Sequence, residues 1–293
     1  MMEVLENPTP ADIEALIAKA RTAMPAYTDM LTFYEAVFKV QAEGQVEVPP
    51  SSIPIDAQRA TLFWKEGFPL LAPVELPVDV AHGADLLVRL CRAVEGLKTE
   101  PARAAATIRA ALDAERLRAD TLLEARLEKD PSRLDAMAAG LSVRSEIIAF
   151  FADQSLTPSR VAGRRRITAH LKAEPEWHNG YCPVCGSPPA LGDLEENGQR
   201  QLCCGFCWHR WPFQRVRCVQ CGQLDPAKLY YLHSDEEPAY RVDACDACQH
   251  YIKTVDRRRL GRPFFAPLEQ VLTTHLDLLA AEEELSPVPG RSF

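Results

Sequence analysis

Eight cysteines near the end of the chain form four C-x-x-C pairs: Cys182/Cys185, Cys204/Cys207, Cys218/Cys221 and Cys245/Cys248. A C-x-x-C turn points two sulfurs toward one ion, and thiolates from two such turns make the tetrahedral set typical of structural metal sites. The four pairs therefore predict metal binding.

Loop lengths predict which pairs share an ion. Cys185 and Cys204 are separated by 18 residues, and Cys221 and Cys245 by 23, which leaves room for a β-hairpin in each case. Only 10 residues separate Cys207 from Cys218, which suits a linking strand. We therefore expect site 1 to consist of Cys182, Cys185, Cys204 and Cys207, and site 2 of Cys218, Cys221, Cys245 and Cys248.

Two other uses of C-x-x-C pairs fit the chain less well. A thioredoxin-like redox motif is a single pair at the start of a helix in a βαβ unit. Disulfides require an oxidising compartment, and residues 1–10 lack the apolar segment of a signal peptide. Glycine follows Cys185 and Cys221, and it readily takes the positive φ that a tight metal knuckle needs.

The spacing does not identify the metal. Four thiolates suit zinc and equally suit a single iron of the rubredoxin kind. The hairpin-length loops argue against a ferredoxin-type cluster, so we expect two mononuclear ions, iron or zinc. A closed four-cysteine site has no open position for a substrate, and we therefore expect the metals to be mainly structural.

Four residues in and between the two sites are candidates for contact with a partner: Cys203, Trp211, Arg215 and Arg217. Cys203 is the extra cysteine of the second knuckle, and is either a reactive thiol or, as we favour, a small apolar filler. The mixed aromatic and basic run that contains Trp211 could stack on single-stranded nucleic acid. The aromatic residues of this run could instead form the core between two small modules, and we favour this interpretation for them.

Composition and motifs exclude several classes of protein. The 293 residues carry a formal net charge of −8, and residues 175–262 have 11 basic and 11 acidic side chains, unlike a nucleic-acid-binding surface. No apolar stretch reaches the roughly 20 residues that span a bilayer. Nucleotide-loop, H-E-x-x-H and G-x-S-x-G motifs are absent. We expect a cytoplasmic protein that is no enzyme, binds no nucleic acid and is not inserted in a membrane.

Sequence periodicity predicts an α+β fold with three parts. Residues 1–174 have apolar positions at helical spacing and form an all-helical domain. Residues 175–262 alternate strand-like runs with turns, and form a tandem metal-ribbon domain with modules at 181–212 and 213–253. Residues 263–293 are expected to form a C-terminal helix and tail.

The residues around the cysteines resemble those of a known family. The matching runs are Tyr181–Pro189, Leu202–Cys207 followed by Trp211, Arg217–Gly222, and Arg241–Cys248 with Tyr251–Lys253. In this order they resemble the formate dehydrogenase accessory protein family, FdhE. Over residues 1–174 the resemblance is in length and helical character, and Cys203 departs from the family pattern.

The resemblance implies a chaperone-like maturation factor that formate dehydrogenase requires for activity. It would bind the catalytic subunit of that enzyme in the cytoplasm before export. The family's metal cysteines correspond to the eight cysteines of sites 1 and 2, and the resemblance favours rubredoxin-type iron over zinc. The alternatives are a redox or sulfur-handling protein that uses Cys203, and a nucleic-acid-binding zinc-ribbon protein. The oligomeric state stays open, with a homodimer as one option.

Overall fold

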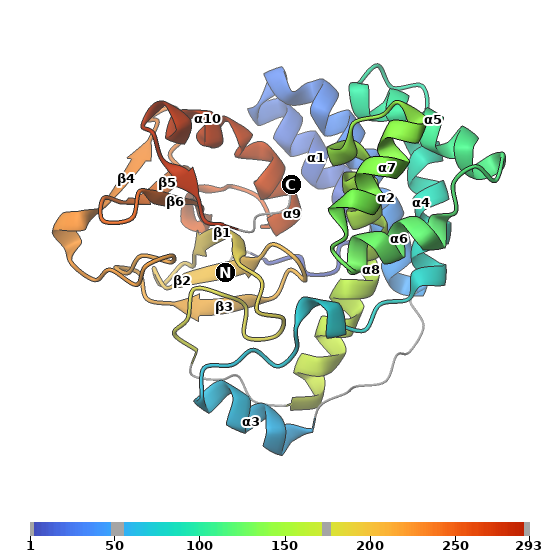
Figure 1. The fold of residues 1–293 in the computed structure, drawn as a ribbon. Helices are drawn as coiled ribbons and strands as arrows, with labels where there is room; N and C mark the ends of the chain where they lie inside the picture. The colour runs from blue at the N-terminus through green and yellow to red at the C-terminus, as the bar shows by residue number, and fades with distance from the viewer. Residues whose placement is uncertain (1–2, 48–55, 172–176, 290–293) are drawn as a thin grey trace. The chain divides into compact units, whose positions relative to one another are not determined.

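A computed structural model describes residues 3–47, 56–171 and 177–289, and divides the chain into two compact units (Figure 1). Unit 1 consists of Met1–Glu6, Pro54–Leu76 and Arg164–Phe293, and unit 2 of Asn7–Ile53 and Pro77–Gly163. The boundary expected at residue 174 lies outside the described residues. The three-part division from the sequence stays a prediction.

Unit 2 is built from helices. They are α1 (Pro10–Ala23), the 3₁₀ turn η1 (Pro25–Tyr27), α2 (Thr28–Glu47), α4 (Val80–Ala93), α5 (Glu100–Asp113), α6 (Ala119–Leu127), α7 (Pro131–Leu141) and the first part of α8 (Ser145–Leu171). Side-chain caps define several starts: Thr9 accepts a hydrogen bond from the N–H of Asp12, and Asp79 accepts one from that of His82.

The core of unit 2 comes from the apolar stripes of these helices. The stripe of α4 buries Leu86, Leu87 and Leu90 completely, and α4 packs against α2, α5 and α6. The helical character expected of the N-terminal region is therefore confirmed. No described helix of the chain combines the length and the apolar character that crossing a bilayer requires.

Unit 1 is built around one seven-stranded sheet. Its strands are β1 (Pro189–Leu194), β2 (Arg200–Cys204), β3 (Arg210–Phe213), β4 (Leu229–His233), β5 (Tyr240–Cys245), β6 (His250–Asp256) and β7 (Ser286–Pro287). The order is β3-β2-β1-β6-β5-β4, with β7 beside β6. Strands β1–β3 form one antiparallel set and β4–β6 another, and the parallel pair β1·β6 joins the two sets.

The parallel junction depends on a glycine. Gly192 of β1 lies opposite Thr254 of β6. A Cβ atom at Gly192 would lie 3.2 Å from Oγ1 of Thr254 and 3.3 Å from the carbonyl oxygen of Gln201. Both contacts are tight, so the absence of a side chain lets the three strands approach one another here.

Two short helices, α9 (Ala266–Leu272) and α10 (Thr274–Glu282), pack on the sheet (Figure 1). The expected single C-terminal helix is thus interrupted at Thr273. Thirteen buried residues form the shared core: Leu191, Cys203, Ala239, Tyr240, Val242, Ala244, Tyr251, Val255, Phe264, Ala266, Leu276, Ala280 and Leu285. Unit 1 therefore has a substantial apolar core besides its cysteines.

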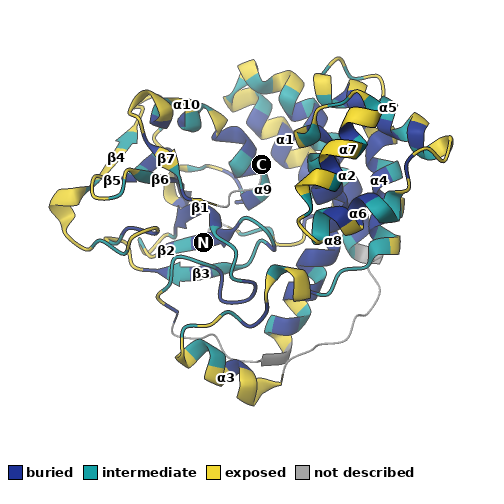
Figure 2. Cartoon of the chain, viewed as in Figure 1, coloured by how far each residue is buried: buried dark blue, intermediate teal, exposed yellow. Residues whose placement is uncertain are grey.

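Two segments from earlier in the chain complete unit 1. Near the N-terminus, the N–H of Phe264 donates to the carbonyl of Glu3, and the N–H of Leu5 donates to the carbonyl of Phe264. The second segment contains α3 (Ala57–Lys65) and the 3₁₀ turn η2 (Pro73–Glu75). In Figure 2, β1 is buried throughout, whereas α3 is exposed along most of its length. Two more 3₁₀ turns, η3 (Pro226–Lys228) and η4 (Arg257–Arg259), lie next to β4 and β6.

Candidate metal centres

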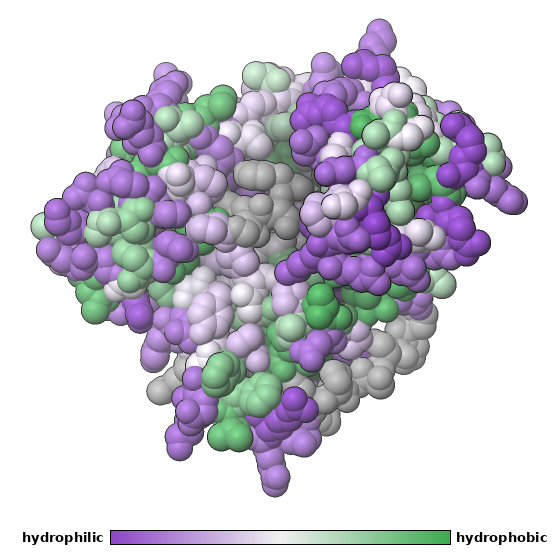
Figure 3. Space-filling view, in the orientation of Figure 1, coloured by the Kyte–Doolittle hydropathy of each residue, from purple (hydrophilic) through white to green (hydrophobic). Residues whose placement is uncertain are grey.

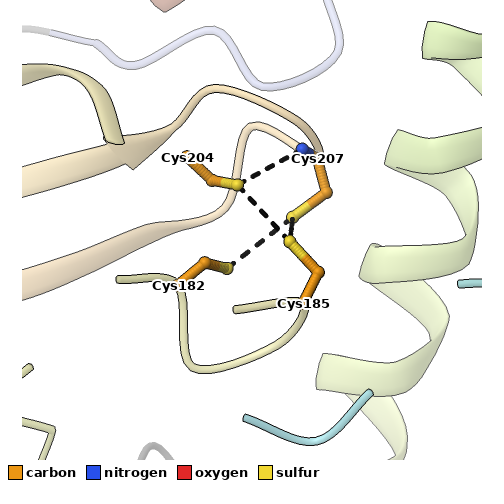
Figure 4. A group of neighbouring side chains, drawn as sticks. All are labelled: Cys182, Cys185, Cys204 and Cys207. Atoms are coloured by element: carbon orange, nitrogen blue, oxygen red, sulfur yellow. Dashed lines mark hydrogen bonds between the residues drawn. The ribbon is translucent and has the colours of Figure 1, made fainter. Parts of the chain in front are cut away.

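Site 1 brings together four sulfurs from two turns of the chain (Figure 4). Cys182 and Cys185 lie in the turn before β1, Cys204 is the last residue of β2, and Cys207 lies in the turn between β2 and β3. The Sγ–Sγ distances are 3.8 Å for Cys182 and Cys207, 3.5 Å for Cys185 and Cys204, and 3.6 Å for Cys185 and Cys207.

Site 2 repeats this arrangement at the turn between β5 and β6. Cys218 and Cys221 precede β4, and Cys245 and Cys248 flank the β5–β6 turn. The Sγ–Sγ distance is 3.6 Å for Cys218 and Cys248, and 3.7 Å for Cys221 and Cys245. In each site, all four sulfurs lie within 4.8 Å of one another.

These sulfur spacings fit a tetrahedral metal ion. Sulfurs about 2.3 Å from a central ion form a tetrahedron with edges of about 3.8 Å. A disulfide would instead require about 2.05 Å between two sulfurs, and all ten cysteines are free thiols. Two four-cysteine sites that could hold a metal ion are therefore present, and their geometry does not distinguish iron from zinc.

The backbone has the same conformation in all four knuckles. The residue after the second cysteine has a positive φ: 68° at Gly186, 55° at Trp208, 74° at Gly222 and 55° at Gln249. The two glycines were visible as a signal in the sequence. Trp208 and Gln249 carried no such signal, since residues with a side chain enter this region only when the surrounding structure imposes it.

Backbone N–H groups point at the sulfurs. The N–H of Val184 donates to Sγ of Cys182 at 3.4 Å, and those of Phe206 and Cys207 donate to Sγ of Cys204 at 3.3 and 3.4 Å. Such hydrogen bonds favour the thiolate form.

The pKa values of two thiols in site 1 are shifted in opposite directions. Burial raises the pKa of Cys182 well above the ordinary value of a thiol. Hydrogen bonds from Cys182 and Cys204 lower the pKa of Cys185 well below it. Four buried thiolates repel one another unless a cation lies between them, and a coordinating thiol is deprotonated outright. The donor set thus fits a metal ion.

The two sites differ in burial. All four cysteines of site 1 are completely buried. In site 2, Cys221 is exposed and Cys248 is half-buried. The chemistry of the ligands is the same in both, so the difference comes from the segments that surround them.

The segment after α3 covers site 1. The N–H groups of Leu70 and Leu71 donate to the carbonyls of Pro183 and Val184, each at 3.0 Å. Nε1 of Trp64 also donates to the carbonyl of Pro183, at 3.2 Å. Pro183 and Val184 are the two residues between the first pair of cysteines. The sequence showed that this loop is partly apolar but did not show where it packs.

Buried ion pairs brace the strands beside site 1. Asp193 of β1 is completely buried and accepts hydrogen bonds from Arg210 of β3, at 2.7 Å from Nη2 and 3.1 Å from Nε. Nη1 of Arg257 in η4 lies 3.5 Å from the same carboxylate. This network links three elements, and sequence reasoning did not identify it.

The four candidate partner contacts lie in different environments. Cys203 is completely buried in the core of the sheet, and burial raises the pKa of its thiol well above the ordinary value. Trp211 is also buried, and its Nε1 donates to the carbonyl of Asn179 at 3.3 Å. Arg215 is exposed and Arg217 is half-buried. The side chains of the two arginines are therefore accessible to a partner, whereas those of Cys203 and Trp211 are not.

Comparisons with known proteins point in one direction. No protein-family model matches the chain. "Protein FdhE homolog" of Aquifex aeolicus is 37% identical over 111 residues, which are 36% of this chain and 39% of that protein. "Protein FdhE" of Escherichia coli K12 is 36% identical over 91 residues, 30% of this chain and 29% of that protein. The matched segment therefore spans two-fifths or less of these relatives.

The likeness in structure covers more of the chain. The crystal structure of the FdhE protein from Pseudomonas aeruginosa superposes with a TM-score of 0.61 and 22% identity, over 98% of this chain and 97% of that one. The chain has the FdhE fold. The resemblance to the FdhE family inferred from the residues around the cysteines is thereby confirmed, and so is the α+β arrangement of helical region, two cysteine knuckle groups and C-terminal helix.

Proposed function

We propose that this chain is an accessory factor for formate dehydrogenase, which binds the catalytic subunit of that enzyme in the cytoplasm before export. Support comes from the FdhE-named relatives and from the FdhE fold. The observation that carries the proposal is the pair of four-cysteine sites set into one continuous sheet. A reducing cytoplasm suits these sites because it keeps their thiols available as ligands.

The eight cysteines would act as structural ligands. A bound ion in each site would cross-link two knuckles, and metal binding of this kind contributes about 10–16 kcal/mol to folding in small zinc domains. Site 1 is buried beneath Leu70 and Leu71, which leaves no path for a substrate to reach its sulfurs. The chain itself would therefore bind and stabilise its client rather than catalyse a reaction.

The two alternative functions have weaker support. A sulfur-handling protein needs an accessible thiolate, and Cys203 is buried with a raised pKa. A nucleic-acid-binding ribbon needs exposed aromatic rings, and Trp211 is buried with its indole N–H already hydrogen-bonded.

The proposal can be tested in a formate-respiring host that lacks this chain. We expect formate dehydrogenase activity to disappear and to return with the intact chain. A tagged chain should capture the catalytic subunit from the cytosolic fraction, and metal analysis of the complex should find two ions per chain. A Cys204→Ser variant should lose its bound metal and fail to restore activity, whereas Cys91→Ser, at a buried cysteine outside both sites, is the matched control.

Two results would contradict this function. One is full formate dehydrogenase activity in the host that lacks the chain. The other is restored activity when the captured chain has no catalytic subunit of formate dehydrogenase bound to it.

A further inference from the structure

A pocket of about 260 Å³ lies beside site 2. Residues of β4, β5 and β6 line it together with the loop that leads to Cys218. Four arginines are among the lining residues: Arg200, Arg215, Arg217 and Arg241. The only carboxylate among the lining residues that the structure describes is Asp243, so four positive charges less one negative charge leave +3.

This positive charge exceeds what site 2 can offset. Four thiolates around a divalent ion carry a formal charge of −2, and around a trivalent ion −1. Cys218 and Cys245 of site 2 also line the pocket, so the pocket and the filled site together keep a net positive charge. The surplus stands out because the chain as a whole carries −8.

Arg200 has unused hydrogen-bonding capacity in this pocket. Its side chain is only 3% exposed. Nη1 donates to the carbonyl of Arg217 at 3.3 Å, but Nε and Nη2 make no hydrogen bond within the described part of the chain. Nη2 is ion-paired with Asp243, so Nε is the nitrogen that has no partner among the described residues, and buried donors normally have one. Arg210, beside site 1, has its Nε and Nη2 both bonded to Asp193.

Asp243 is shared between Arg200 and other groups. Oδ2 of Asp243 accepts a hydrogen bond from Oγ1 of Thr254 at 2.7 Å, and Oδ1 lies 2.7 Å from Nε of Arg241. Nη2 of Arg200 lies 3.2 Å from Oδ2 without hydrogen-bond geometry. One carboxylate is thus shared between two arginines, and a second carboxylate would complete the set.

The rim of the pocket suits an extended peptide. β4 is the edge strand of the sheet, and Tyr230 and Tyr231 on it are 40% and 56% exposed. Val216, on the loop opposite, is 44% exposed. An edge strand offers unpaired backbone groups to an added strand, and neighbouring pockets then select its side chains. Figure 3 shows hydrophobic and hydrophilic residues mixed over the part of unit 1 that carries β4 and β5.

We propose that this pocket binds a carboxylate side chain of an acidic, extended segment of a partner protein. Arg200 and Arg215 would hold the carboxylate, and β4 with its tyrosines would hold the backbone and apolar side chains of the segment. A peptide is favoured over nucleic acid because one compact pocket takes one acidic group, whereas a nucleic acid requires a basic track. The inference does not depend on formate dehydrogenase being the partner.

The test uses the full, metal-loaded chain and a short labelled peptide that alternates leucine with glutamate. Its control is the same peptide with glutamine in place of glutamate. We expect fluorescence anisotropy to show binding of the acidic peptide only. Arg200→Gln and Arg215→Gln should each weaken binding at least about tenfold, since each removes a charged partner of the carboxylate. Arg259→Gln is the matched control, because Arg259 is an exposed arginine of unit 1 that does not line the pocket.

Further measurements keep the result interpretable. Arg215 is exposed, so its variant should keep the melting temperature of the parent chain even if Arg200→Gln lowers it. Equal binding of the two peptides, or unchanged binding by Arg215→Gln, would overturn the proposal. So would preference for single-stranded RNA or for inorganic phosphate alone. Absence of all binding would also overturn it.

Discussion

Sites 1 and 2 have the same ligands and the same knuckle backbone, but not the same surroundings. The cysteines of site 1 are completely buried, whereas Cys221 of site 2 is exposed. The knuckle itself is a local structure, set by two cysteines and a residue with positive φ. Burial is instead decided by distant segments, above all by the backbone of Leu70 and Leu71. Identical metal motifs in one chain can therefore have different roles.

The ion pairs around the two sites also differ, since those beside site 1 are more complete than those beside site 2. Beside site 1, Asp193 is fully matched by Arg210 and Arg257 in a buried network. Beside site 2, Asp243 forms ion pairs with both Arg200 and Arg241, and Nε of Arg200 has no acceptor among the described residues. Site 1 thus lies in a buried environment, whereas site 2 lies partly at the surface.

The largest expected effect is loss of a ligand from site 1. Cys204→Ser removes a sulfur from a completely buried set, and the loss should approach the roughly 10 kcal/mol that a structural metal contributes. Since whole domains are stable by only about 5–15 kcal/mol, unit 1 should unfold. Limited proteolysis and circular dichroism should show digestion of the sheet region and survival of the helices of unit 2.

Cys221→Ser in site 2 is the comparison, and its effect should be smaller. Cys221 is an exposed residue, so water can complete the coordination of the ion. We expect a folded sheet with weakened metal binding at site 2. Equal unfolding by the two substitutions would show that burial does not separate the roles of the sites.

The next effect is selective metal loss. A chelator should remove the ion of site 2 first, because its exposed ligand admits the competing group, while the ion of site 1 should leave only as unit 1 opens. Two kinetic phases of equal amplitude are expected, followed by absorbance or by a metal-sensitive dye. A single phase for both ions would contradict the difference between the sites.

Breaking the ion pairs of site 1 should have an intermediate effect. Asp193→Asn removes the completely buried carboxylate and leaves Glu195, 3.5 Å from both Arg210 and Arg257, as their remaining counter-charge. Breaking a buried pair typically costs about 3–5 kcal/mol, and the presence of Glu195 places the expected cost at the lower end. The control is Asp246→Asn, because Asp246 lies between two cysteines of site 2 and pairs with the exposed Lys228. Denaturant unfolding should show a large shift for the first substitution and almost none for the second.

Features of the two sites that are set by neighbouring residues were predictable from the sequence, whereas features set by residues far apart in the chain were not. Cysteine spacing and the glycines after Cys185 and Cys221 are local signals, and from them the knuckles and the hairpins were predictable. The α+β arrangement followed from periodicity. The parallel pairing of β1 with β6 was not predictable, because Gly192 and Thr254 are far apart in the chain and carry no motif.

The candidate contacts show the same limit. Arg215 and Cys203 were both candidates from the sequence, although a small apolar filler was favoured for Cys203. Arg215 is exposed, and Cys203 lies in the core. Arg200 was not singled out at all, since a single arginine in a strand carries no local signal of burial. The environment of Arg200 is set by the carbonyl of Arg217 and the carboxylate of Asp243, which the fold places next to its guanidinium group.

The smallest expected effect on stability distinguishes the backbone conformation after the second cysteine of a pair from the packing of the segment after α3 against site 1. Gly186→Ala and Gly222→Ala share the cost of a side chain at positive φ, about 1 kcal/mol. An added Cβ at Gly222 would only touch the end of Arg217, 3.5 Å away, but at Gly186 it would lie 3.0 Å from Cγ of Pro69 in the covering segment. Gly186→Ala should therefore destabilise unit 1 more than Gly222→Ala.

A double-mutant cycle isolates that extra cost. Pro69→Ala removes the atom that the new methyl group would meet, so it should bring the effect of Gly186→Ala close to that of Gly222→Ala in denaturant unfolding. If the gap between the two glycine substitutions persists without Pro69, the covering segment does not press on the first knuckle. The burial of site 1 would then be a property of the sheet alone, and the distinction between the two sites would have to rest on their charges.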